Sequence, residues 1–126
     1  MINILFVAQN YVALANALLA ATVPFAPMSS FSTSYELIHL LRTSGATRVF
    51  VDPHLLPQLL AAAEEVGLPR TSIYILEGSS SGYKSFQDLV NEVREAGLER
   101  LPVKLASKDT LAYLVFSSGT TGLPKG

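Results

Sequence analysis

Hydroxyl side chains, glycines and a lysine fill the last ten residues of this 126-residue chain, Ser117–Gly126, which read SSGTTGLPKG. Gly119 and Gly122 can adopt positive φ angles, so a ligand can approach the main chain closely there. Successive main-chain N–H groups around such a turn form a nest that binds anions, and the hydroxyl groups add further donors. Pro124 stiffens the turn before Lys125, whose ammonium group can offset phosphate charge. We therefore expect a phosphate-binding loop; the alternative is a flexible Gly/Ser/Thr surface loop.

The spacing in this loop differs from that of the Walker A motif. Gly119 and Lys125 are separated like the first glycine and the lysine of G-x-x-x-x-G-K-[ST]. Pro124, however, stands where that motif has its second glycine, and Gly126 stands where it has the hydroxyl that binds Mg²⁺. No G-x-G-x-x-G follows the first expected strand, so the sequence gives no support for a dinucleotide-binding fold.

The residues before the loop alternate between strand-like and helix-like patterns. Thr33 and Glu36 have the spacing of a capping box, and Gly45, Gly67 and Gly97 each follow a helical pattern. The expected strands are 2–8, 23–28, 47–52, 72–78 and 110–118, and the expected helices are 11–22, 35–45, 54–67 and 85–97. This alternation predicts an α/β fold with a mainly parallel sheet and flanking helices. The strands lack a period of two, as expected when both faces of a sheet are covered.

The last expected strand leads directly into the loop. Ligands of α/β sheets bind beyond the carboxyl ends of the strands, so the loop is expected at the edge where ligands bind. A second segment with small residues and a lysine, 78–84, is interpreted as a solvated connector.

Composition excludes several classes of function. Charged residues make up 15% of the chain and the net charge is −1, which gives no electrostatic footprint for nucleic acid or an anionic membrane. The absence of cysteine excludes disulfides, cysteine-ligated metals and thiol nucleophiles. His39 and His54 have no spaced partner of the kind a metal site needs, so both are interpreted as ordinary surface or packing side chains.

The first 35 residues carry no charge, and part of this stretch could be taken for a signal peptide or a membrane span. A signal peptide needs a positively charged start, which is missing. Gln9, Asn10 and Asn16 interrupt the apolar run, and Pro24 and Pro27 break its end, so a span is disfavoured. We expect a buried strand and helix instead.

The terminal motif resembles the signature of the adenylate-forming superfamily, which holds acyl- and aryl-CoA synthetases, luciferases and the adenylation domains of peptide synthetases. The stretch YLVFSSGTTGLPKG matches that signature at every position. FVAQNYV with Asn10, PMSSFSTSYELIHLLRTSGATRVFVD and YKSFQDLV are similar to upstream segments of the same family. Together they make the chain similar to the front of a 4-coumarate–CoA ligase-like enzyme. The stretch AQN, Ala8–Asn10, is a departure, because ligases of this group often have proline before the asparagine.

The resemblance implies a ligase reaction in two steps. A carboxylate attacks the α-phosphate of ATP to give an acyl-adenylate and pyrophosphate, and the thiol of CoA then displaces AMP. ATP, CoA and Mg²⁺ are implied for the full-length parent, with a small-molecule carboxylic acid as the other substrate and with no nucleic acid partner. The implied contacts to the ATP phosphates are Ser117, Ser118, Gly119, Thr120, Thr121, Gly122 and Lys125. No catalytic residue and no metal ligand is assigned within this chain.

The resemblance also implies that residues 1–126 are part of the large N-terminal domain, truncated at both ends, and are inactive alone. The compartment implied is the cytoplasm or the peroxisome, without secretion. A luciferase-like parent, an amino-acid-adenylating parent and a non-catalytic truncated remnant remain alternatives.

Overall fold

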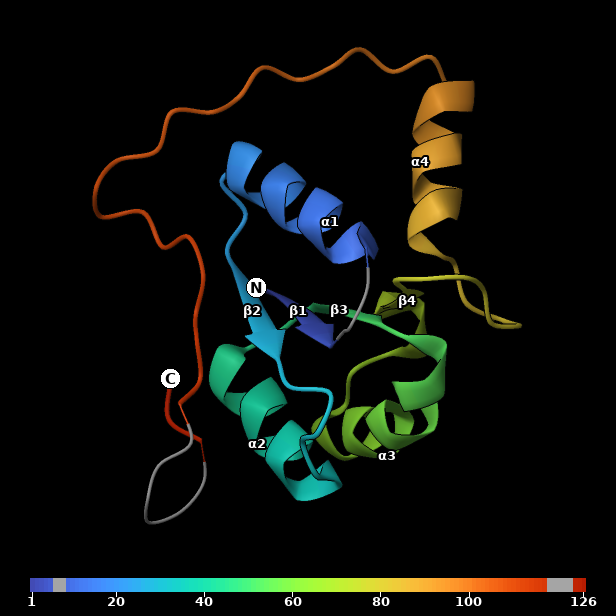
Figure 1. Cartoon of the computed structure of the whole chain (residues 1–126), viewed down its shortest axis with the longest axis vertical. Helices are drawn as coiled ribbons and strands as arrows, with labels where there is room; N and C mark the ends of the chain where they lie inside the picture. The colour runs from blue at the N-terminus through green and yellow to red at the C-terminus, as the bar shows by residue number, and fades with distance from the viewer. Residues whose placement is uncertain (6–8, 118–123) are drawn as a thin grey trace.

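A four-stranded parallel sheet forms the centre of the fold (Figure 1). The structure, a computed structural model, describes residues 1–5, 9–117 and 124–126. The strands run in the order β2-β1-β3-β4, and every neighbouring pair is parallel. Their bounds are β1 (Ile2–Leu5), β2 (Phe25–Met28), β3 (Arg48–Val51) and β4 (Ile73–Ile75).

Helices cover both faces of this sheet, which confirms the predicted α/β class. The α-helices are α1 (Gln9–Ala20), α2 (Ser34–Ser44), α3 (Leu56–Val66) and α4 (Phe86–Glu95), and short 3-10 helices span Pro53–Leu55 and Arg70–Ser72. In Figure 1, α1 lies on one face of the sheet, while α2 and α3 lie side by side on the other. The helices expected from the sequence are all present, with bounds shifted by a few residues.

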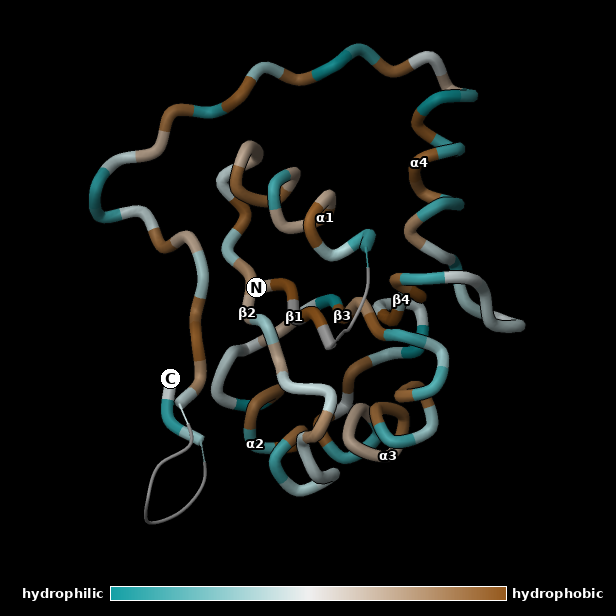
Figure 2. Tube along the Cα trace, in the orientation of Figure 1, coloured by the Kyte–Doolittle hydropathy of each residue, from teal (hydrophilic) through white to brown (hydrophobic). Residues whose placement is uncertain are grey.

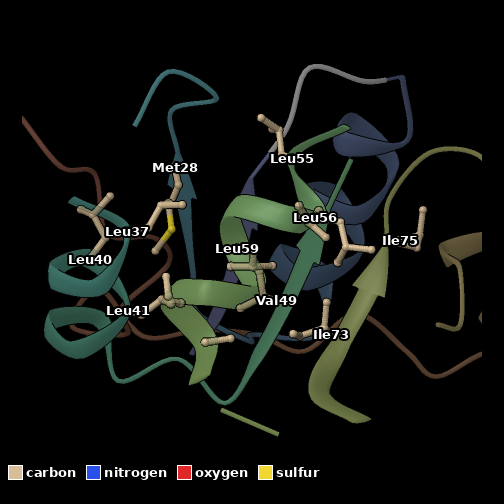
Figure 3. Close-up of a cluster of buried hydrophobic side chains, with 13 residues drawn as sticks. Met28, Leu37, Leu40, Leu41, Val49, Leu55, Leu56, Leu59, Ile73 and Ile75 are labelled. Carbon is tan, nitrogen blue, oxygen red and sulfur yellow. The ribbon is translucent and has the colours of Figure 1, made fainter. Parts of the chain in front are cut away.

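The larger core cluster lies between the sheet and the pair α2 and α3. Figure 3 shows Leu37 of α2 and Leu59 of α3 directed toward Val49 and Ile73 of the strands. All of these side chains are almost completely buried. On the opposite face, Leu14 and Leu18 of α1 pack with residues of the strands, including Ile4 and Phe50. Because β3 contributes side chains to both clusters, its sequence is apolar without alternation.

The helix ends follow the local rules that the sequence indicates. The Thr33 hydroxyl accepts from the main-chain N–H of Glu36, whose carboxylate accepts from the Thr33 main chain, so the predicted capping box is present. Gly45 ends α2 with φ 58°, in the left-handed region that glycine adopts most easily. A second capping box, which the sequence analysis did not single out, joins Ser85 and Asp88 at the start of α4.

The strand expected over 110–118 is wrong in its extent over 110–117, and Ser118 lies outside the described residues. This segment runs parallel to β2 along its outer edge through one bridge, Phe25 with Tyr113. Phe25 donates its N–H to Ala112 O at 3.3 Å and accepts from Leu114 N at 2.9 Å. Two residues on, the same side of β2 presents Pro27, which has no N–H to donate. The parallel ladder therefore cannot continue, since a proline confines a strand to the edge of a sheet.

A long connector joins α4 to this outer segment and passes outside α1 (Figure 1). Brown apolar positions alternate with polar ones along it in Figure 2, and Leu98, Leu101, Val103 and Leu105 are exposed. Lys104 attaches the connector to the fold by donating its main-chain N–H to Ala20 O at 3.0 Å. Among the described residues, no helix is both long enough and apolar enough to cross a bilayer.

Candidate phosphate-binding site

The two ends of the predicted phosphate loop meet in a narrow neck, defined here as Ser117 with Lys125. The Ser117 N–H donates to Lys125 O at 2.8 Å, and the Lys125 N–H donates to Ser117 O at 3.0 Å. This reciprocal pair is an antiparallel bridge. The other predicted phosphate contacts lie outside the described residues: Ser118, Gly119, Thr120, Thr121 and Gly122. Their role in binding phosphate stays a prediction.

The neck lies at the carboxyl edge of the sheet, where the sequence predicted the loop. The outer segment runs parallel to β2, so its end at Ser117 is on the same side as the end of β2 at Met28. A cavity of about 330 Å³ beside it is lined by Met28, Phe31, Glu36, Phe116 and Pro124, among others. The loop therefore leaves the outer edge of the sheet. The point where the strand order reverses, beside which ligands of doubly wound folds commonly bind, lies between β1 and β3 instead.

The neck determines which of its groups can face an anion. Both main-chain N–H groups, of Ser117 and Lys125, already donate to carbonyl oxygens within the neck. The Ser117 hydroxyl is 3.3 Å from Lys125 O, a long hydrogen bond that a phosphate oxygen could replace. Lys125 is exposed. At the neck, then, a phosphate would be bound by the hydroxyl and ammonium side chains and not by the main chain.

Gly126, the residue after Lys125, packs against side chains of the outer segment. A Cβ atom at Gly126 would lie 2.9 Å from Cε1 of Phe116 and 3.1 Å from Cδ1 of Leu114. Carbon atoms do not approach that closely, so only glycine fits here without displacement of the Phe116 ring. The Phe116 ring is therefore tightly packed against the residue that follows the neck.

A histidine that the sequence analysis interpreted as ordinary contacts the loop. His39 lies on α2, and its Nε2 is 2.9 Å from the carbonyl oxygen of Pro124, the residue before Lys125. The separation of 85 residues explains why no local pattern revealed this contact. His54, by comparison, is exposed on the 3-10 helix before α3.

Asn10, which the sequence analysis related to the family, joins the start of α1 to the end of β4. Its main-chain N–H donates to Glu77 Oε1 at 2.8 Å, and its Nδ2 donates to Leu76 O at 2.9 Å and to Glu77 Oε2 at 3.1 Å. The carboxylate thereby accepts from one of the N–H groups that the first turn of a helix leaves unpaired, and its negative charge suits that end of the helix dipole. Asn10 has a positioning role in the fold.

The described residues offer no cluster of three or more metal-ligating side chains. Near the neck, the Glu36 carboxylate is already used in the capping box, accepting from both the main chain and the hydroxyl of Thr33. A Mg²⁺ ion prefers several oxygen ligands, and the described surroundings of the neck do not supply them.

Segment 78–84, which the sequence analysis interpreted as a solvated connector, carries an ion pair at its lysine. Lys84 pairs with Glu92 at 2.6 Å, and both side chains are exposed, which fits that interpretation. The hydrogen bond and the charge of Glu92 raise the pKa of Lys84.

Comparison with known protein families identifies the chain. A model of the family "AMP-binding enzyme" matches residues 7–126. A phenylacetyl-CoA ligase of Aspergillus niger is 37% identical over 99 residues, which are 74% of this chain and 18% of the relative. An acyl-CoA ligase of the same species is 36% identical over 98 residues, again 74% of this chain and 18% of the relative. The chain thus spans about a fifth of the length of these curated relatives.

Solved structures agree on the fold. A long-chain-fatty-acid–CoA ligase of Archaeoglobus fulgidus is 25% identical with a TM-score of 0.76, covering 99% of this chain and 24% of its own. A red-emitting luciferase of Phrixothrix hirtus has a TM-score of 0.83 at 21% identity, covering 99% of this chain and 24% of its own, and bears on the fold alone. Because the family model matches residues 7–126 and the relatives are CoA ligases, this chain belongs to the family of AMP-binding enzymes.

Proposed function

We propose that this chain is the N-terminal part of an ATP-dependent ligase that joins an acyl or aryl carboxylic acid to coenzyme A. The observation that carries the proposal is the neck, which brings Ser117 and Lys125 together at the carboxyl edge of a parallel sheet. The names of the relatives add to it, since they include a phenylacetyl-CoA ligase and acyl-CoA ligases. Because the chain spans only 18% of those relatives, residues 1–126 are proposed to be one part of a larger catalytic domain.

In the proposed reaction, a carboxylate oxygen attacks the α-phosphorus of ATP, and the bond to the bridging oxygen of pyrophosphate breaks. The CoA thiol then loses its proton to solvent, its sulfur attacks the acyl carbon, and AMP leaves with the electron pair of the broken C–O bond. Negative charge develops on the leaving pyrophosphate in the first step. A cation and hydroxyl donors held beside it lower the barrier, since they stabilise the transition state more than the ground state.

Lys125 and Ser117 are the described residues that we propose for this role. Lys125 would lie near the β- and γ-phosphates, with its charge most needed as pyrophosphate departs. Mg²⁺ is proposed as a further requirement of the reaction, and no cluster of ligands for it is assigned among the described residues. We expect the ligase in the cytoplasm or the peroxisome.

The test is the exchange of radioactive pyrophosphate into ATP, measured on the ligase that contains this chain. Lys125→Ala is expected to slow the exchange by about a hundredfold or more, the usual loss when one such donor is removed. The affinity for the carboxylic acid should change little, because the lost interaction belongs to the transition state. Lys108→Ala, at an exposed lysine of the connector, is the matched control and should leave the exchange unchanged. Equal exchange rates in the two variants would refute the role of Lys125.

A further inference from the structure

The side chain of His39 is hydrogen-bonded to the peptide group between Pro124 and Lys125. The acceptor is the carbonyl oxygen of Pro124, 2.9 Å from Nε2, and a carbonyl oxygen has no proton to give. The hydrogen bond therefore requires a proton on Nε2 of His39. Both the neutral Nε2–H tautomer and the imidazolium ion have that proton, so the contact does not depend on the charge of the ring.

The peptide between Pro124 and Lys125 is held at both ends. Its carbonyl oxygen accepts from His39, and its N–H donates to Ser117 O at 3.0 Å. A peptide group is planar, so two opposed hydrogen bonds fix the orientation of the whole plane. The Cα atom of Lys125 is the last atom of this plane, and the side chain extends from it. Rotation of the plane would redirect that side chain.

The donor is itself held firmly. His39 is half-buried on α2, between the almost completely buried residues Leu37 and Leu40, which belong to the main core cluster. The capping box of Thr33 and Glu36 fixes the first turn of the same helix. The core therefore fixes the helix from which the His39 ring extends.

We propose that His39 is a positioning residue for Lys125, acting through the Pro124 carbonyl; this rests on the proposed function of Lys125 as a phosphate contact. His39 does not reach the phosphates itself. It sets the plane from which the lysine side chain departs, so that the ammonium group is in place before pyrophosphate leaves. Such preorganisation raises the rate because the enzyme does not have to order the group during the reaction.

The first experiment uses the 126-residue chain without nucleotide. Nitrogen NMR of the histidine ring on the unaltered chain should show the proton of His39 on Nε2. His39→Leu should speed hydrogen exchange of the Lys125 amide about tenfold, the effect of losing one hydrogen bond of ordinary strength. His39→Gln, whose amide can donate from a similar place, should stay within about threefold of the unaltered chain. His54→Leu, at the chain's exposed other histidine, is the control and should change nothing.

Two results on the chain alone would overturn the proposal. One is a neutral His39 with its proton on Nδ1. The other is unchanged exchange at Lys125 in a folded His39→Leu variant, with the amides of Ile4 and Val49 as the reference for folding. If His39→Leu unfolds the chain, the tautomer and the His39→Gln variant decide the matter.

The second experiment measures pyrophosphate exchange in the ligase that contains this chain. His39→Leu should lower kcat about tenfold with little change in the KM for the carboxylic acid, and His39→Gln should recover most of the loss. The two proposals fail in different ways. Absence of exchange in the unaltered ligase would refute the proposed function, whereas exchange that His39→Leu leaves unchanged would refute only the role of His39.

Discussion

Replacing Asn10 with alanine should destabilise the fold, because it detaches the start of α1 from the end of β4. The variant loses two hydrogen bonds from Nδ2, to Leu76 O at 2.9 Å and to Glu77 Oε2 at 3.1 Å. The main-chain N–H of residue 10 can still donate to Glu77 Oε1. The side chain therefore accounts for one bond to a neutral carbonyl and one to a carboxylate.

The magnitude follows from these contacts. A neutral hydrogen bond contributes about 1 kcal/mol, and one to a charged group contributes about 1.5–3 kcal/mol. Both bonds are partly buried, which favours the lower values. Alanine also favours the helix by roughly 0.6 kcal/mol over asparagine, which offsets part of the loss. We expect a net decrease of about 2 kcal/mol in the free energy of unfolding.

The assay is urea unfolding followed by circular dichroism, with Asn16→Ala as the matched control. Asn16 lies on the same helix and is exposed, and within the described part of the chain its side chain donates to Val12 O of that helix. Its replacement should change the free energy of unfolding by no more than about 0.5 kcal/mol. A double-mutant cycle of Asn10→Ala with Glu77→Ala should give a coupling of about 1–1.5 kcal/mol for the bond between the two side chains. Equal stability of Asn10→Ala and Asn16→Ala, or a coupling near zero, would refute the reasoning.

Three further predictions concern the core, the helix ends and ATP. Leu59→Ala, at a fully buried position between α3 and the sheet, should lower the free energy of unfolding by about 2–5 kcal/mol, and a loss below about 1 kcal/mol in urea would contradict this. Hydrogen bonds from Thr33 and Ser85 lower the pKa of the Glu36 and Asp88 carboxyls below their ordinary values of 4.5 and 3.8. The ionised carboxylates therefore stabilise the fold above the ordinary pKa values, and this stabilisation is lost as the pH falls through the lowered pKa values. NMR titration should find both midpoints below the ordinary values, and Glu36→Gln and Asp88→Asn should flatten the acid dependence of stability. The 126-residue chain alone should bind ATP no more tightly than about 1 mM, or about −4 kcal/mol, because exposed phosphate contacts compete with water; micromolar binding in calorimetry would be the contrary result.

Local patterns predicted most of the fold. The capping residues Thr33 and Glu36 and the terminal Gly45 act within one helix, so the bounds of α2 could be read from neighbouring residues. The parallel sheet followed from the alternation of strands and helices, since parallel neighbours need a crossover between them. Those features depend on residues a few positions apart.

The features that the sequence did not reveal depend on distant residues. The strand over 110–118 looked regular because its own residues suit a strand, but its partner β2 presents Pro27 to it. The contact of His39 with Pro124 and that of Asn10 with Glu77 each join segments more than 60 residues apart. For the candidate site, the terminal motif predicted which residues take part. The pairing of Ser117 with Lys125 and the contact of His39 with Pro124 are visible only in the structure.

The single bridge between β2 and the outer segment has a consequence for the order in which the chain folds. Phe25 and Tyr113 lie far apart in sequence, and the outer segment adds little burial, since Leu111, Tyr113 and Val115 remain 51%, 55% and 58% exposed. Closing so long a loop is entropically unfavourable until the sheet and α2 already exist. The outer segment should therefore join late, after the folding transition state, and its loss should leave the sheet and its helices as a separate cooperative unit. Changes at this edge would then alter the unfolding of the neck while the folding rate of the sheet stays the same.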